Sequence, residues 1–254
     1  MPTITALRAV NFVALALLTG VALAWMAAGG FGRAGFFLAP VTMLGEVPAA
    51  LRMVTPDLLC VSLAVAGLAA LRRGPWPLAA GCCALATLER PDFVLFPAAL
   101  LGVALVARSG VRAAAGCLGA AALAYAATML AGDHPGWWVH FSVSLIERPA
   151  DFAAAPPFSL DAYLRAFARA NYGNLATQGW PALALLLAAC WLLLRERWAD
   201  RQADLLFAAL LLSLAARCVV FPMPDDRLYL PTVMMLAMLV AERWGRGPRR
   251  PAAR

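Results

Sequence analysis

Long runs of apolar residues, separated by short polar stretches, extend along almost the whole chain. A helix needs about 20 mostly apolar residues to cross the hydrocarbon core of a bilayer, and fewer where neighbouring helices shield it. By this criterion the pattern predicts nine spanning helices. Their approximate ranges are 8–28, 34–53, 57–71, 75–89, 92–107, 111–131, 180–194, 204–222 and 228–243.

The expected fold class is all-α, a polytopic transmembrane helical protein with one membrane domain over residues 1–254. The strict alternation of apolar and polar residues that a half-buried strand requires is absent from these runs. The second run is the weakest of the nine, because Pro40, Glu46 and Pro48 interrupt it.

Composition supports this class, since 63% of the residues are hydrophobic and 14% are charged. A soluble domain is about 45–50% apolar and about 25% charged, and one core of this length cannot bury so much apolar surface. Disordered chains are poor in apolar residues and are excluded too. The six cysteines lie inside apolar runs, so we expect free, buried thiols and no disulfide framework.

Charge predicts the orientation of the helices, because arginines gather on the cytoplasmic side of membrane proteins. All 21 basic residues are arginines, and the net charge is +7. With the basic tail 244–254 inside and the helices alternating, the inner side holds 13 arginines and four acidic residues. The outer side holds eight arginines and ten acidic residues. The N-terminus is therefore expected outside and the C-terminus inside, and the positive charge is not a nucleic-acid signal.

The first apolar run has an alternative interpretation as a secretory signal peptide. Arg8 precedes the run, and the small residues Ala22 and Ala24 near its end are typical of a cleavage site. That interpretation would place Arg8 inside and change the alternation of the next helix.

The longest polar stretch is an outer loop at about 132–179, which contains a candidate amphipathic helix. Ser159 is a suitable N-cap, and Asp161 and Arg165 are spaced for an i,i+4 pair. Leu160, Tyr163, Leu164 and Phe167 share one face. The helix is expected either to lie on the outer membrane surface or to pack on the ends of the spans.

Ionisable residues at the outer ends of the spans are the candidates for chemistry, because charge in lipid is often functional. Arginine suits the phosphate of a lipid-linked substrate, since guanidinium matches phosphate oxygens bidentately. The candidate substrate-binding residues are Arg90, Asp92, Arg217, Asp226, Arg227 and Tyr229. The alternative is local pairing of Arg90 with Glu89 or Asp92 and of Arg227 with its acidic neighbours, while Arg217 extends to the interface.

The two histidines, His134 and His140, do not predict a metal site. They lack a nearby carboxylate cluster, and a solvated loop is the expected setting for them. No nucleophile elbow, phosphate-binding glycine loop or zincin motif occurs. We therefore expect no metal site and no cofactor, although a divalent metal is not excluded.

The order of several short motifs resembles GT-C membrane glycosyltransferases, particularly bacterial relatives of the protein O-mannosyltransferases and the lipid A aminoarabinose transferase. Two motifs resemble the starts of spans in this family. The first, Ala6-Leu7-Arg8 with Val10-Asn11, resembles the start of the second span, and the other, Thr55-Pro56-Asp57, resembles the start of a later span. Leu88-Glu89-Arg90-Pro91-Asp92 resembles the family's Leu-Thr-Arg-Pro-acidic turn, and Asp226-Arg227-Leu228-Tyr229-Leu230-Pro231 its Arg-Tyr-Leu-Leu-Pro motif.

The resemblance implies transfer of a sugar from a polyprenyl-phosphate donor to a glycan, lipid or protein acceptor at the outer face of a bacterial inner membrane. The family's first outer loop carries an acidic general base, but no acidic residue precedes Glu46 here, and Leu228 is an insertion. The catalytic base is therefore unassigned. An N-terminally truncated enzyme is expected; the alternatives are a degenerate relative, a non-catalytic membrane subunit, or a small-molecule transporter. No nucleic-acid partner is expected.

Overall fold

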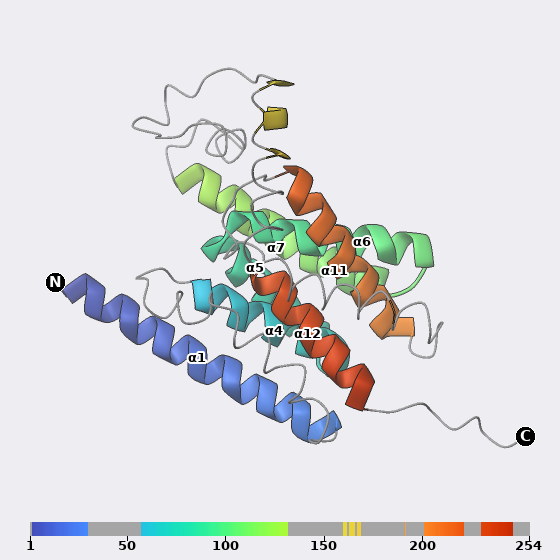
Figure 1. Ribbon diagram of the computed structural model, residues 1–254, viewed down its shortest axis with the longest axis horizontal. Helices are drawn as coiled ribbons and strands as arrows, with labels where there is room; N and C mark the ends of the chain where they lie inside the picture. Colours follow the sequence, from blue (N-terminus) through green and yellow to red (C-terminus); the bar gives the residue numbers. More distant parts are fainter. Residues whose placement is uncertain are drawn as a thin grey trace, which may run out of the picture.

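The structure is a computed structural model that describes residues 2–29, 57–131, 201–220 and 230–245. It also describes seven residues of the segment 160–168 and residue 191. Within these ranges every regular element is a helix and no strand is present (Figure 1). The expected all-α class is confirmed for the described part of the chain.

Seven of the nine predicted spans coincide with described helices. The elements are α1 (Pro2–Gly29), α4 (Asp57–Arg73), α5 (Trp76–Glu89), the 3-10 helix η1 (Pro91–Val94), α6 (Leu95–Ala107), α7 (Val111–Ala131), α11 (Arg201–Val220) and α12 (Leu230–Gly245). The predicted spans 34–53 and 180–194, apart from residue 191 of the latter, lie outside the described residues.

Proline residues, and residues with a positive φ, mark the places where α5 and α6 begin or end. Pro75 and Pro77 flank the first residue of α5, a position where a missing N–H is tolerated. Pro91 stops α5, because the preceding Arg90 is held in an extended conformation. Arg108 closes α6 with φ of 51°, and Gly110 follows with φ of 69°.

The helix ends gather at two opposite ends of the bundle. At one end Arg72 of α4 hydrogen-bonds Gln202 of α11, and Arg201 donates to the Ala107 carbonyl at the end of α6. Arg112 of α7 stacks over Trp76 at the start of α5. We call this the basic end, and its described arginines are Arg72, Arg73, Arg108, Arg112, Arg201 and Arg243. The α5–η1–α6 turn, the end of α11 and the start of α12 form the opposite end.

Helix α12 packs against α4, α11 and α1, and every one of its side chains from Leu230 to Glu242 is buried. The other helices pack in pairs, α4 with α5, α5 with α7, and α6 with α11, and α1 lies along one side against α4 (Figure 1). Helices α4 and α5 approach closely, because a Cβ atom on Gly67 would lie 3.1 Å from the Cβ of Cys82. Four described cysteines are buried and free, as expected: Cys60, Cys82, Cys83 and Cys117.

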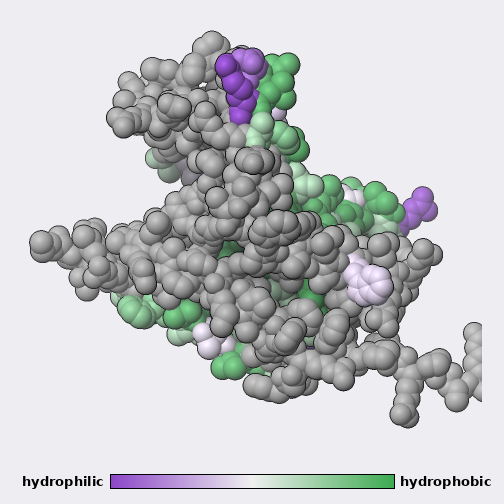
Figure 2. All heavy atoms as spheres, in the orientation of Figure 1, coloured by the Kyte–Doolittle hydropathy of each residue, from purple (hydrophilic) through white to green (hydrophobic). Residues whose placement is uncertain are grey.

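Apolar side chains also cover the outside of the bundle. Among the described helices only α7 is long and apolar enough to cross a membrane, and only 22% of its most apolar window is buried. Leu123 and Leu130 of α7 are 75% and 87% exposed. Figure 2 shows hydrophobic side chains at the surface along α1 and over α6. A soluble protein would hide such a helix in its core.

Hydroxyl groups on these helices hydrogen-bond the carbonyl four residues earlier. Thr19 donates to Leu15, Thr87 to Cys83, and Thr128 to Ala124, at 2.8, 2.8 and 3.0 Å. Such back-bonding satisfies a polar group without water. These three hydroxyl groups therefore need no hydrogen bond from water.

Candidate functional site

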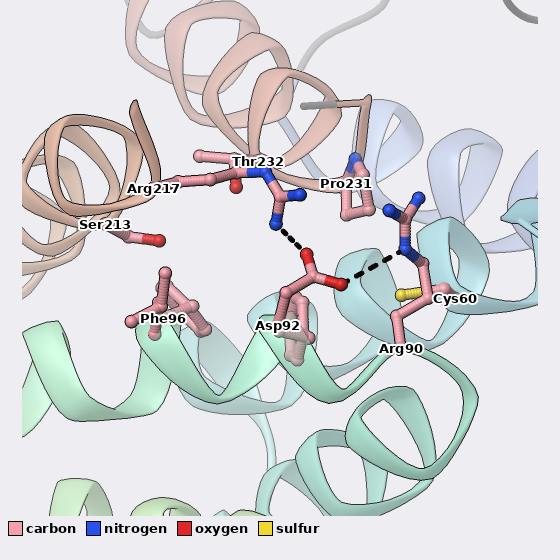
Figure 3. Close-up of a pocket in the computed structure, with 10 residues that line it drawn as sticks. Cys60, Arg90, Asp92, Phe96, Ser213, Arg217, Pro231 and Thr232 are labelled. Atoms are coloured by element: carbon pink, nitrogen blue, oxygen red, sulfur yellow. Dashed lines mark ion pairs between the residues drawn. The ribbon is translucent and has the colours of Figure 1, made fainter. Parts of the chain in front are cut away.

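Three of the predicted site residues meet at the end of the bundle opposite the basic end. Asp92 lies between two arginines, with its Oδ1 atom 3.5 Å from Nε of Arg90. Its Oδ2 atom forms an ion pair with Nη1 of Arg217 (Figure 3). We call Arg90, Asp92 and Arg217 the Asp92 cluster.

The turn between α5 and α6 fixes two members of the cluster. Arg90 is extended before Pro91, and its carbonyl accepts the N–H of Phe93 at 2.9 Å. Phe93 is buried and packs on Phe96, with ring centres 5.7 Å apart. Because the aromatic side chain anchors the short 3-10 helix, the carboxylate of Asp92 is held toward α11.

Helix α11 supplies the third member. Arg217 lies in its last turn, and Ser213 lies one turn earlier on the same face. Both side chains are buried, and both line the same pocket as Asp92. A serine and an arginine spaced i,i+4 in an apolar helix are the local signal that this face of α11 is polar.

The cluster is nearly enclosed and carries unequal charges. The side chains of Arg90, Asp92 and Arg217 are 8%, 17% and 5% exposed. Two guanidinium groups face one carboxylate, so these three residues together hold one excess positive charge. Burying charge is costly unless it is paired, so the ion pairs with Asp92 help to hold both guanidinium groups inside the protein.

The pocket beside the cluster is small. Its cavity volume is about 10 Å³, which is close to the minimum that holds one water molecule. The lining adds Cys60 of α4, Pro231 and Thr232 of α12, and the ring of Phe96 to the charged groups (Figure 3). A larger ligand therefore requires a lining side chain to move.

The structure describes three of the six predicted substrate-binding residues, Arg90, Asp92 and Arg217. The local pair of Arg90 with Asp92 is confirmed. Arg217 does not extend to the surface, since its buried guanidinium group pairs with Asp92. Asp226, Arg227 and Tyr229 lie outside the described residues. Three further lining residues, Cys60, Ser213 and Thr232, were not predicted from the sequence. Only Ser213 had a local signal, its i,i+4 spacing from Arg217 in an apolar helix.

The described residues of the segment 160–168 contact this end of the bundle. Tyr163 donates a hydrogen bond of 2.6 Å to the carbonyl of Val219, two residues after Arg217. The predicted i,i+4 pair of Asp161 and Arg165 is present, while Leu164 on the same segment is exposed. The contact agrees with the expectation that this helix packs on the ends of the spans.

A second ionic cluster braces the basic end. Arg72 donates two hydrogen bonds to Glu242, at 3.1 and 3.0 Å, and their side chains are 5% and 3% exposed. Arg73 adds a bond of 3.2 Å to the same carboxylate and lies 6.0 Å from the ring centre of Trp25. The cluster joins α4 to α12 and brings α1 alongside. Its bidentate geometry is typical of a structural brace.

The polar groups of the Asp92 cluster are two guanidinium groups and one carboxylate. No group of three or more histidine, cysteine or acidic residues within the described ranges is placed to hold a metal ion. Two guanidinium groups offer planar donors that match carboxylate or phosphate oxygens. Comparison of the chain with protein-family models, with curated proteins and with solved structures finds no match.

Proposed function

We propose that the chain is an integral membrane protein whose Asp92 cluster binds the phosphate of a polyprenyl-phosphate sugar, as part of a GT-C-type glycosyltransferase. One observation carries this proposal: two buried arginines flank a single carboxylate at one end of an apolar helix bundle. A lipid-linked phosphate would present its anion at this end of the bundle, with its apolar chain along the helices.

The membrane assignment is supported by the apolar exterior of the helices. Helix α7 is apolar along its length yet mostly unburied, which suits lipid better than a soluble core or an N-terminal signal sequence. We extend this to nine spans, with the N-terminus outside and the C-terminus inside. The basic end carries six described arginines, Arg243 of α12 included, against two acidic residues, Asp204 and Glu242, which favours the cytoplasmic side. The Asp92 cluster then faces outward, in the inner membrane of a bacterium.

The arginines suit the leaving group of the proposed reaction. When the sugar moves to an acceptor, the bond to the polyprenyl phosphate breaks and the phosphate gains negative charge. Fixed cations in a site that excludes water stabilise such charge strongly. Arg90 and Arg217 are the residues to which we assign this role, and Asp226, Arg227 and Tyr229 are further candidates for substrate contact.

A non-catalytic subunit that holds the lipid-linked donor is the second candidate function. The observation that favours it is the engagement of both Asp92 oxygens by guanidinium groups. A carboxylate in that arrangement is poorly placed to remove a proton from an acceptor hydroxyl, as a general base must. We therefore assign no general base among the described residues.

Transfer by the purified chain tests the proposal. The full chain in proteoliposomes is given radiolabelled polyprenyl-phosphate mannose or aminoarabinose with a membrane extract as acceptor. We expect label to reach the acceptor, and Arg217→Ala to reduce that transfer at least tenfold, while Arg165→Ala, in an exposed pair, leaves it unchanged. Donor binding without transfer would favour the subunit. The proposal is overturned if the chain neither binds nor transfers the donor, or if it takes up a small solute instead.

A further inference from the structure

We propose that Asp92 is an internal competitor for the ligand phosphate, which enters the site by displacing the carboxylate from Arg217. This inference rests on the proposed function and assigns the way in which the same site opens. It follows from the size of the pocket and the geometry of the two ion pairs.

The size of the pocket requires displacement. A volume of about 10 Å³ admits one water at most, whereas a phosphate group carries four oxygens around phosphorus. Each oxygen of Asp92 lies against one of the two arginines, so the carboxylate stands between the guanidinium groups. A carboxylate that bridges two arginines occupies the place that two phosphate oxygens would take.

Asp92 is the member of the cluster best able to move. Its side chain is 17% exposed, against 8% for Arg90 and 5% for Arg217. It also belongs to a 3-10 helix of four residues, whereas Arg217 is built into a helix of 20. The exchange therefore requires only a rotation of a short side chain at the edge of the pocket.

The two ion pairs of Asp92 differ in what they join. The pair with Arg90 lies within one turn, so it can persist when the turn shifts. The pair with Arg217 joins that turn to α11, so it is the one that an incoming phosphate breaks. After the exchange each arginine still has an anionic partner, the phosphate on Arg217 and the carboxylate of Asp92 on Arg90.

Asp92→Asn tests the exchange, because it removes the competing charge and nearly preserves the shape of the side chain. Polyprenyl phosphate is titrated onto the full chain in nanodiscs. We expect about a tenfold tighter Kd for Asp92→Asn, since the ligand no longer displaces a charge-assisted bond. Asp161→Asn is the matched control, because it removes the same charge from an exposed arginine pair, and its Kd should equal that of the wild type.

The outcomes separate this inference from the proposed function. Equal or weaker binding to Asp92→Asn, with clear binding to the wild type, overturns the exchange alone. No binding to either protein overturns the proposed function. If Asp92→Asn does not fold, the exchange is tested on the wild-type chain by measuring carbodiimide labelling of the Asp92 carboxylate. Labelling should rise with polyprenyl phosphate and not with polyprenol, and unchanged or reduced labelling contradicts the exchange.

Discussion

Glu242→Ala is expected to lower the free energy of unfolding by about 3–5 kcal/mol, the largest stability effect of any single substitution considered for this chain. Glu242 accepts two hydrogen bonds from Arg72 and one from Arg73, and its side chain is 3% exposed. Removing the carboxylate leaves the guanidinium of Arg72 in a buried position without its anionic partner. The desolvation of that cation is then no longer offset.

Two further variants establish the cause of that loss. Asp161→Ala breaks the pair with Arg165, whose two side chains are 75% and 74% exposed, and should cost about 0–1 kcal/mol because water screens it. The double variant Arg72→Met/Glu242→Met removes both charges and should recover most of the lost stability. Denaturant unfolding in detergent micelles measures all three. A Glu242→Ala loss no larger than that of Asp161→Ala would refute the buried brace.

Arg217→Ala is expected to weaken the binding of polyprenyl phosphate by about 10- to 100-fold. A hydrogen bond between charged groups contributes about 1.5–3 kcal/mol, and each 1.4 kcal/mol is a factor of ten in Kd. The fold should persist, because Asp92 keeps its pair with Arg90 in the same turn. The loss should therefore appear in ligand affinity rather than in the amount of folded protein.

Arg217→Lys separates charge from geometry in this prediction. Lysine keeps the positive charge but lacks the planar fork of donors, so an affinity between those of the wild type and Arg217→Ala is expected. Arg112→Ala is the control, since that exposed arginine lies at the basic end beside Trp76. Binding is followed by fluorescence or native mass spectrometry in nanodiscs. Unchanged affinity for Arg217→Ala would exclude it as a phosphate ligand.

The sequence predicted helices well because the apolar runs that define them are local. The span expected at 111–131 coincides with α7. The span expected at 204–222 differs from α11, which begins at Arg201. The apolar run marks the part suited to lipid, whereas the helix continues into polar residues that contact other helices. Gln202, for example, bonds both Arg72 and the carbonyl of Leu71.

The ionic clusters were predictable only where they are local. The Arg90–Asp92 pair follows from residues two positions apart across a proline. The Asp92–Arg217 pair depends on how α6 packs against α11, and the Arg72–Glu242 pair joins residues 170 positions apart. Neither can be read from periodicity, because a single sequence does not say which helices are neighbours. The role of Asp92 as a bridge between two arginines is therefore a result of the structure.

The central claim is that the Asp92 cluster recognises the phosphate of a lipid-linked substrate. The most direct test compares the wild-type chain in nanodiscs with polyprenyl phosphate and with polyprenol of the same length, which differs only in lacking the phosphate. We predict that the phosphate form binds at least about tenfold tighter, because only it offers an anion to Arg217. Equal affinity for the two lipids would contradict the claim.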